Sequence, residues 1–326
     1  SNTMQHQLRN AKIIHSKFSF YYFISEVGNN QLRLINKSTT LGAIYKDDFK
    51  SIPIIFPPIQ DQIIISNYLD EKTKIIVDLI HKKEKIIELL KEERTALINQ
   101  AVTKGLYPNV KFKPSGVEWL GTIPEHWEVK KIKYIIEGKL KYGANESAEL
   151  ENRDFPRYIR ITDFGDNGKL REETFKSLDP KVATEYLLSE GDILFARSGA
   201  TVGKTFQFKN YSGLACFAGY LIKATPKRNL ILSDFLYLFT RGSSYENWKN
   251  SIFNQATIQN IGADKYSQLE IALPPISEQI EIIEYLNIEA TRIDKLVNRI
   301  ESEIELIKEY RNTLINEVVT GKIKVS

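Results

Sequence analysis

The residues best suited to chemistry lie in a short loop, Ser198–Thr205, which reads SGATVGKT. It is superficially similar to the phosphate-cradling loop of nucleotide hydrolases. That motif requires glycine where this chain has Ser198, and the following residues (FQFK) alternate as a strand instead of opening a helix. Because the chemistry needs helix N-terminal amides aimed at phosphates, we reject nucleotide hydrolysis. Arg197 and Lys204 bracket the loop and could instead meet a DNA backbone or a base edge, although a simple strand connection would look the same.

No other catalytic constellation stands out in the sequence. It has no dinucleotide-type glycine loop, no acidic-Pro-Pro-aromatic motif of an amino-group methyltransferase and no nuclease-like carboxylate cluster. The one cysteine, Cys216, excludes a disulfide framework, and the four histidines are scattered without metal-ligand spacing: His6, His15, His81 and His126. We therefore expect no metal, no cofactor and no enzyme activity. No apolar run approaches the roughly 20 residues of a membrane span and no signal-peptide pattern is present, which favours a cytoplasmic protein.

Charge is distributed unevenly along the 326 residues, although the net charge is only +4. The range from Ile193 to Asn260 contains eight Lys or Arg and two acidic residues. The range from Glu146 to Asp192 contains twelve acidic and seven basic residues. A local basic surface on a nearly neutral protein suits a phosphate backbone. A solvated lysine-rich surface is the alternative.

The loop at 198–205 and the basic residues around it must be positioned by the rest of the fold, and one long segment of the chain occurs twice. The 51 residues from Ile54 align without a gap with those from Ile271, an offset of 217 residues (271 − 54), with 23 positions identical. So long a period is not that of a solenoid and indicates a duplicated module. The aromatic run Phe18–Ile24 is echoed by Phe235–Phe239, so the repeat extends upstream of these segments.

Each copy contains one long amphipathic helix that begins after a Pro-Pro pair. The segment Gly105–Pro114 ends the first of these helices. Apolar residues recur at seven-residue spacing on an otherwise charged rod, which is typical of a coiled coil. One rod needs a partner, so we expect the two to pair, although each could instead pack on its own globular domain. Lys83 interrupts the first seam where the second copy has Ile300. The predicted seam comprises Leu69, Ile76, Leu90, Leu97, Leu286, Ile293, Ile300, Ile307 and Leu314.

The region between the helices predicts an α+β module with short strands. We expect strands at 155–163, 191–196, 205–208 and 215–224. A short helix should follow Asp179 as its cap, and a helix over 233–240 should be capped by Ser233. Counting back one period from this module, roughly the front half of the first module is absent from the sequence, so a truncated gene, a split subunit and an expression fragment all remain open.

Together these pieces resemble one family, the specificity subunits of type I restriction-modification systems. The resemblance lies in PPI-x-x-Q-x-x-I…YL, ELLKEERTALINQAVTKGL, SGVEWLGTIPEHWEVKKIKY, GDILFARSGATVGK and NQATIQNI, and it covers nearly the whole chain. It implies target-recognition domains that each read one half of a split DNA sequence, joined by two long helices that form an intramolecular antiparallel coiled coil with a pseudo-twofold repeat. The helices would set the spacer between the two half-sites. Methylation and restriction would belong to separate subunits that bind this one.

On this interpretation the chain divides into four parts. Residues 1–53 are the C-terminal part of a first recognition domain, 54–109 the first long helix, 110–270 a second recognition domain and 271–326 the second long helix. Expected partners are double-stranded DNA, methyltransferase subunits, restriction subunits and a second specificity chain or fragment that completes the first domain. A non-catalytic coiled-coil scaffold with a degenerate DNA-binding domain is the alternative function.

Only the second domain is complete enough to name DNA-facing candidates. Arg197 and Gln255 are the expected base readers, since Arg pairs with guanine and Gln with adenine, and Lys141 and Lys204 are the expected phosphate contacts. The full set of candidates is Lys141, Tyr142, Arg160, Thr162, Arg197, Ser198, Thr201, Lys204, Gln255 and Thr257.

Overall fold

The computed structural model describes residues 13–35, 46–54, 56–165, 168–199, 201–253 and 260–325. The chain forms two compact units. The first comprises Ser1–Leu90 with Asp294–Ser326, and the second comprises Lys91–Ile293. Each long helix contributes residues to both units. No helix in the described part of the chain is long and apolar enough to cross a lipid bilayer.

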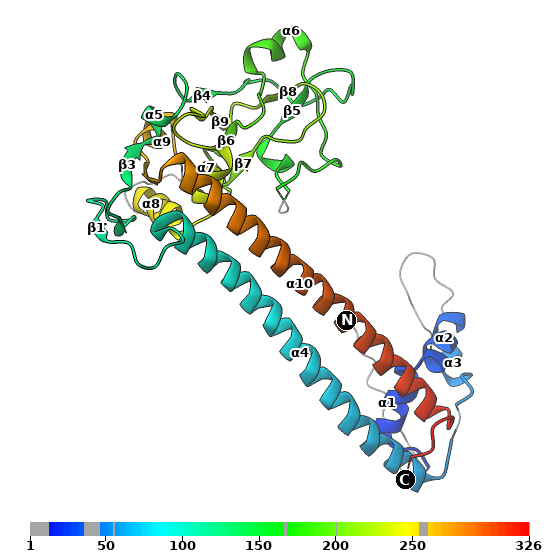
Figure 1. The fold of residues 1–326 in the computed structure, drawn as a ribbon. Helices are drawn as coiled ribbons and strands as arrows, with labels where there is room; N and C mark the ends of the chain where they lie inside the picture. Colours follow the sequence, from blue (N-terminus) through cyan, green and yellow to red (C-terminus); the bar gives the residue numbers. More distant parts are fainter. Residues whose placement is uncertain are drawn as a thin grey trace. The chain divides into compact units, whose positions relative to one another are not determined.

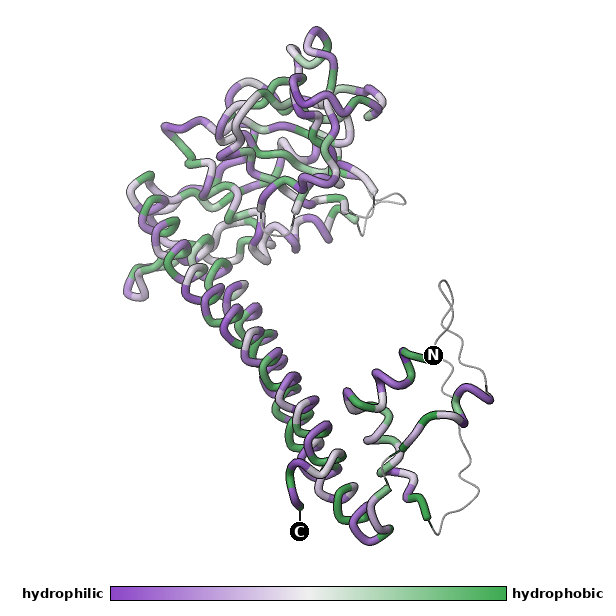
Figure 2. The backbone as a smooth tube through the Cα atoms, turned by 90° about the vertical axis from the view of Figure 1, so that its right-hand side faces the viewer, coloured by the Kyte–Doolittle hydropathy of each residue, from purple (hydrophilic) through white to green (hydrophobic). Residues whose placement is uncertain are grey.

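The two long helices are α4 (Ile59–Lys104) and α10 (Ile276–Val319), shown in Figure 1. Apolar and polar residues alternate around both, as the hydropathy colouring in Figure 2 shows, because an amphipathic helix buries only one stripe. Gly105, with a φ of +73°, ends α4 in the left-handed conformation that glycine adopts without strain.

In the first unit the N-terminal part of α4 runs antiparallel to the C-terminal part of α10, and α1 (Ser16–Ile24) and α2 (Glu26–Ile35) pack on the pair. The short helix α3 (Lys46–Lys50) packs on α1 through Phe49 and Phe23. The core of the first unit joins aromatic residues of α1, including Phe18, to Leu69 on α4 and Val318 on α10. Lys83 does not leave the seam unpaired, because its Nζ donates to Glu303 on α10 at 2.6 Å. The break in the apolar pattern is an ion pair between the two helices.

The second unit holds all ten described strands, and its central sheet has the order β4-β9-β6-β7. These strands are β4 (Lys141–Tyr142), β9 (Leu221–Ala224), β6 (Ile193–Ala196) and β7 (Thr205–Gln207), and every neighbouring pair is antiparallel. The other described strands form three two-stranded sheets. They are β1 (Phe112–Pro114) with β2 (Thr122–Pro124), β3 (Glu128–Lys131) with β10 (Glu270–Leu273), and the parallel pair β5 (Arg157–Ile159) with β8 (Ala215–Phe217).

The short helices of the second unit lie between these strands in the sequence. They are α5 (Ile132–Ile135), α6 (Pro180–Ala183), α7 (Ser233–Phe239), α8 (Ser243–Phe253) and α9 (Ala263–Ser267), with 3₁₀ turns at Ile161–Asp163 and Thr184–Tyr186. The main core joins Trp127, Phe235, Tyr245 and Trp248 to the C-terminal part of α4 and the N-terminal part of α10.

The 217-residue repeat is preserved in three dimensions. Adding 217 to the first residue of α1, α2, α3 and α4 gives the first residue of α7, α8, α9 and α10. Gln62 and Gln279 are both fully buried in equivalent positions. The Gln62 amide donates to the carbonyls of Ile13 (2.9 Å) and Pro57 (2.8 Å) and accepts from His15 N–H (2.8 Å).

The second copy makes the same three hydrogen bonds. Gln279 donates to the carbonyls of Leu230 (2.9 Å) and Pro274 (2.9 Å) and accepts from Leu232 N–H at 2.8 Å. The partners are the 217-residue equivalents of those of Gln62. In each copy, one buried amide therefore ties the chain before a short helix to the start of a long helix. We call each arrangement a glutamine joint.

Three sequence predictions were wrong in detail. The strand expected over 155–163 is confined to β5, and Ile161–Asp163 form a 3₁₀ turn. Residues 215–224 form two strands, β8 and β9, which pair with different partners because Gly219 and Tyr220 turn the chain between them. Ser233 is the first residue of α7 and does not cap it, since its hydroxyl donates to the Gly191 carbonyl at 2.6 Å. Asp179 does cap α6, by accepting from Lys181 N–H at 2.8 Å.

Candidate nucleic-acid interface

Arg197 lies at the end of β6, where three segments of the second unit meet. Its guanidinium lies over the ring of Tyr142 on β4, 5.0 Å from the ring centroid, and its Nη1 donates to the Gly219 carbonyl at 3.5 Å. Its backbone N–H donates to Tyr220, and its carbonyl accepts from Ile261 N–H at 2.8 Å. The side chain is half-buried, and its Nε has no hydrogen-bond partner among the described residues. Arg197 is therefore oriented by a stacked aromatic ring, its Nε is buried, and its Nη2 has no hydrogen-bond partner among the described residues.

Tyr142 is itself anchored through its hydroxyl. That oxygen accepts from Ala263 N–H, the first amide of α9, at 2.9 Å, while the ring remains 44% exposed. Ser198 forms an isolated bridge with Asn260, so the chain leading into α9 runs beside the Arg197 loop. Strand β4, the end of β6 and the start of α9 together hold the Tyr142–Arg197 pair.

The loop after Arg197 is a turn between two strands, as the sequence predicted, since β7 begins at Thr205. Gly199 (φ +85°) and Gly203 (φ +83°) both adopt the left-handed conformation, and a Cβ at Gly203 would lie 2.3 Å from the Lys249 side chain. Thr201 is exposed on this turn. The absence of a helix at Thr205 removes the amide cradle of a nucleotide hydrolase.

The two lysine candidates differ in how strongly they are held. Lys141 is exposed on β4, and its side chain forms no hydrogen bond or ion pair with another described residue. The Lys204 ammonium donates to the Phe164 carbonyl at 3.3 Å and is half-buried. Lys141 is the better placed of the two to reach a phosphate.

Arg160 is tied into the protein. Its backbone N–H and its Nε donate to Asp163, which is fully buried, at 2.6 and 3.1 Å, and its Nη2 donates to the Thr174 carbonyl. These contacts satisfy a buried carboxylate, so the side chain has a structural role in addition to any role at a surface. Together with exposed Thr162, Arg160 lines a hollow of about 570 Å³.

Tyr220 was missed by the sequence reasoning. It lies at the turn between β8 and β9, is 64% exposed, and lines the same hollow as Arg160, while its backbone carbonyl accepts from Arg197 N–H. An exposed aromatic ring beside an arginine is a common base-stacking element. The available signal was Gly219, which interrupts an apolar run that we interpreted as a single strand.

Gln255 and Thr257 lie outside the described residues. The remaining candidates fall into two groups around the Gly219–Tyr220 turn. Lys141, Tyr142, Arg197 and Ser198 lie with the start of α9, and Arg160 and Thr162 line the hollow beside Tyr220.

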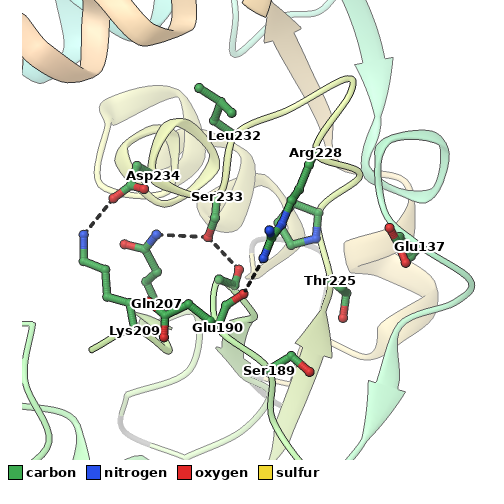
Figure 3. A pocket seen from close by; sticks show the side chains of 12 residues that line it. Glu137, Ser189, Glu190, Gln207, Lys209, Thr225, Arg228, Leu232, Ser233 and Asp234 are labelled. Atoms are coloured by element: carbon green, nitrogen blue, oxygen red, sulfur yellow. Dashed lines mark hydrogen bonds and ion pairs between the residues drawn. The ribbon is translucent and has the colours of Figure 1, made fainter. Parts of the chain in front are cut away.

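A separate hollow of about 490 Å³ lies between β7 and the start of α7, and none of the candidate residues lines it (Figure 3). Its polar groups mostly satisfy one another. Lys209 pairs with Asp234 at 2.7 Å, and the Gln207 amide donates to Ser233 Oγ at 2.9 Å. Because these side chains bind each other, we assign this hollow no part in DNA contact.

The described residues offer no site for thiol or metal chemistry. Cys216 is buried in β8, and burial raises the pKa of its thiol to about 12, so it stays protonated near neutral pH. No group of three or more His, Cys, Asp or Glu side chains within the described ranges is arranged to hold a metal ion.

The family model described as the type I restriction modification DNA specificity domain matches residues 2–89 and 124–306. The chain belongs to this family. Its own architecture of paired long helices with an α+β unit agrees with that membership.

Individual relatives are similar to this specificity-family chain over most of its length. The MjaVIII type I restriction enzyme specificity subunit of Methanocaldococcus jannaschii is 25% identical, over 100% of this chain and 74% of the relative. The StySPI specificity subunit of Salmonella potsdam is 26% identical, over 89% of this chain and 62% of the relative. A chain in a solved structure of the type I R-M system is 15% identical with a TM-score of 0.73, covering 95% of this chain and 72% of that one, which shows a shared fold.

Proposed function

We propose that this chain is the DNA-reading specificity subunit of a type I restriction-modification complex. The observation that carries the proposal is the Tyr142–Arg197 pair, which combines an oriented arginine with an exposed aromatic ring in a member of the specificity family. An arginine held in this way can present two parallel donors to guanine.

The reading domain is the strand-rich part of the second unit, within residues 110–270. Arg197 contacts a base edge, Lys141 contacts a phosphate, and Tyr220 packs against DNA between the two groups of candidates. Gln255 and Thr257 belong to the same proposed set of DNA contacts, with Gln255 as a second base reader. Residues 1–53 belong to a first reading domain.

The chain performs no catalysis and acts in the cytoplasm with subunits that do. Methyltransferase and restriction subunits bind it, and the long helices 54–109 and 271–326 are the surfaces on which they assemble. Exposed apolar side chains of α4, such as Ile75 (55%) and Leu89 (50%), favour this assignment because such side chains mark protein contacts.

Selection from a pool of randomised DNA duplexes tests the proposal. The full chain, alone and with its methyltransferase subunit, should enrich at least one short defined sequence, and binding should weaken steeply as salt rises. If no sequence is enriched under either condition, the chain does not read DNA, and a scaffold function becomes the better account.

A further inference from the structure

Two buried tyrosines contact the turn between β6 and β7, which begins at Arg197. Tyr245 on α8 is fully buried, and its hydroxyl donates to the Gly203 carbonyl at 2.8 Å. Tyr266 on α9 is also fully buried, and its hydroxyl donates to the Ala196 carbonyl at 3.0 Å. The same Ala196 carbonyl accepts from Gly203 N–H at 2.8 Å, which closes the turn. The two hydroxyls therefore hold both ends of the turn.

Helix α9 contacts both members of the Tyr142–Arg197 pair. Ala263 N–H, at the start of α9, donates to the Tyr142 hydroxyl at 2.9 Å. Just before α9, Ile261 N–H donates to the Arg197 carbonyl at 2.8 Å. Because Tyr266 also joins α9 to the end of β6, its hydroxyl helps to fix where Arg197 lies relative to Tyr142.

Helix α8 is anchored to a long helix by a device that occurs in both copies. The Asn99 side chain on α4 accepts from Ser243 N–H, the first amide of α8. Its equivalent, Asn316 on α10, accepts from Val27 N–H in α2 at 3.4 Å. The Tyr245 hydroxyl therefore acts from a helix whose first turn is capped by the long helix.

The two hydroxyls are not part of the repeated framework. The equivalent of Tyr245 is Gly28, where a Cβ would lie 2.1 Å from the Tyr22 carbonyl oxygen, and the equivalent of Tyr266 is Phe49. Helices α2 and α3 therefore form without these hydroxyls. The hydroxyls occur in the unit that carries Arg197, which favours a role in the reading of DNA over a role in the shared fold.

The ring and the hydroxyl of each tyrosine can be separated by substitution with phenylalanine. The Tyr266 ring lies 4.7 Å from the Phe195 ring, and the Tyr245 ring lies 5.6 Å from the Trp248 ring, between centroids. A phenylalanine keeps this packing and removes the donor. Burial raises the pKa of both tyrosines above the usual value, so both hydroxyls are donors near neutral pH.

We propose that Tyr245 and Tyr266 are positioning residues that set the base selectivity of Arg197. Their hydroxyls hold the Gly203 and Ala196 carbonyls and so limit the positions that the Arg197 guanidinium reaches. Both side chains are fully buried, so they act through the turn and not by touching DNA. This inference rests on the proposed function, because it requires that Arg197 reads a base.

The first measurement needs no DNA. Residue-resolved hydrogen exchange of the Arg197 and Gly203 amides is compared in the full chain for wild type, Tyr245→Phe and Tyr266→Phe. Each variant loses one hydrogen bond, so we expect these amides to exchange about three- to tenfold faster. Tyr22→Phe is the matched control. Tyr22 is a fully buried tyrosine of the first unit whose hydroxyl donates to the Pro53 carbonyl at 3.0 Å, and its loss should leave both amides unchanged.

The second measurement is competition binding between duplexes that differ only at the base assigned to Arg197. Tyr245→Phe and Tyr266→Phe should each reduce the preference for the best base about three- to tenfold. In the Arg197→Ala background they should reduce it no further, because the hydroxyls act through Arg197. A purely structural role would weaken binding to all sequences equally and in both backgrounds.

Four results would overturn the proposal. These are unchanged exchange in both variants, the same acceleration in Tyr22→Phe, faster exchange with unchanged base preference, and an equal loss of preference in the Arg197→Ala background. Each variant tests the proposal by itself, so one that does not fold leaves the other to decide. If wild type prefers no base at any position, the proposed function fails and the inference fails with it. If Arg197→Ala loses a preference that both tyrosine variants keep, the inference fails alone.

Discussion

The two glutamine joints are almost the same structure placed in different surroundings. Gln62 and Gln279 each make three hydrogen bonds to equivalent partners, and each lies at the start of a long helix. Around Gln279 the joint is covered by β3 and Trp127, whereas no described residue pairs through its backbone with the equivalent residues Ile54 and Phe56 near Gln62. The joint therefore depends on residues that both copies share, and its cover in the second unit is supplied by residues 127–131.

The first prediction concerns variants that remove the glutamine side chain of each joint. Gln62→Ala and Gln279→Ala should each reduce the free energy of unfolding by about 2–4 kcal/mol, because each leaves three buried backbone groups without partners. Urea unfolding of both variants measures the two losses. Similar losses would support equivalent joints, and a loss at Gln62 below about 0.5 kcal/mol would contradict them.

The second prediction concerns the ion pair between the long helices. The repeat places Ile300 where Lys83 lies, and Ile86 where Glu303 lies. The double variant Lys83→Ile/Glu303→Ile makes the two halves of the repeat alike at these positions. We expect it to unfold at an equal or higher urea concentration than wild type, because a well-packed apolar pair replaces partly buried charges without loss. Lys83→Ile alone should unfold at a lower concentration, since Glu303 then lacks its partner in the seam.

The third prediction concerns Asp70, a carboxylate on α4 that bonds to α1 and has no acidic equivalent in the second copy. Hydrogen bonds from Lys17 and Tyr21 hold the pKa of Asp70 below its usual value, and the equivalent residue in the second copy is Asn287. A lowered folded-state pKa means that the stabilisation is present above pH 3.8 and is lost as pH falls through the folded pKa. Asp70→Asn should remove that part of the acid sensitivity, which melting temperatures measured between pH 6 and pH 3 would show. An unchanged pH profile would mean that Asp70 is not held this way.

The sequence predicts the repeated parts of this fold better than the part that occurs once. The Pro-Pro start and Gly105 stop of the first helix follow from local backbone chemistry, and the 217-residue period extends this to the second copy. The strands of the second unit depend on distant partners. The parallel pairing of β5 with β8 brings residue 157 beside residue 215, and no local pattern encodes it.

The same distinction applies to the candidate site. Arg197 and its loop were recognisable from residue types, but the stacking of Arg197 on Tyr142 depends on β4 joining β9. The roles of Arg160 and Tyr220 could not be inferred either. The role of Arg160 depends on its hydrogen bonds to buried Asp163. The exposure of Tyr220 depends on a turn inside an apolar run.

The most direct test of the central claim compares three proteins in one selection from randomised duplexes. These are wild type, Arg197→Ala and Arg241→Ala, the last removing an exposed arginine of the same unit outside the proposed surface. Arg197→Ala should lose preference at one base position, a cost of about 1–3 kcal/mol there, while the other positions and the Arg241→Ala profile stay as in wild type. An Arg197→Ala profile with every position intact, or weakened equally for all sequences, would contradict base reading by this residue.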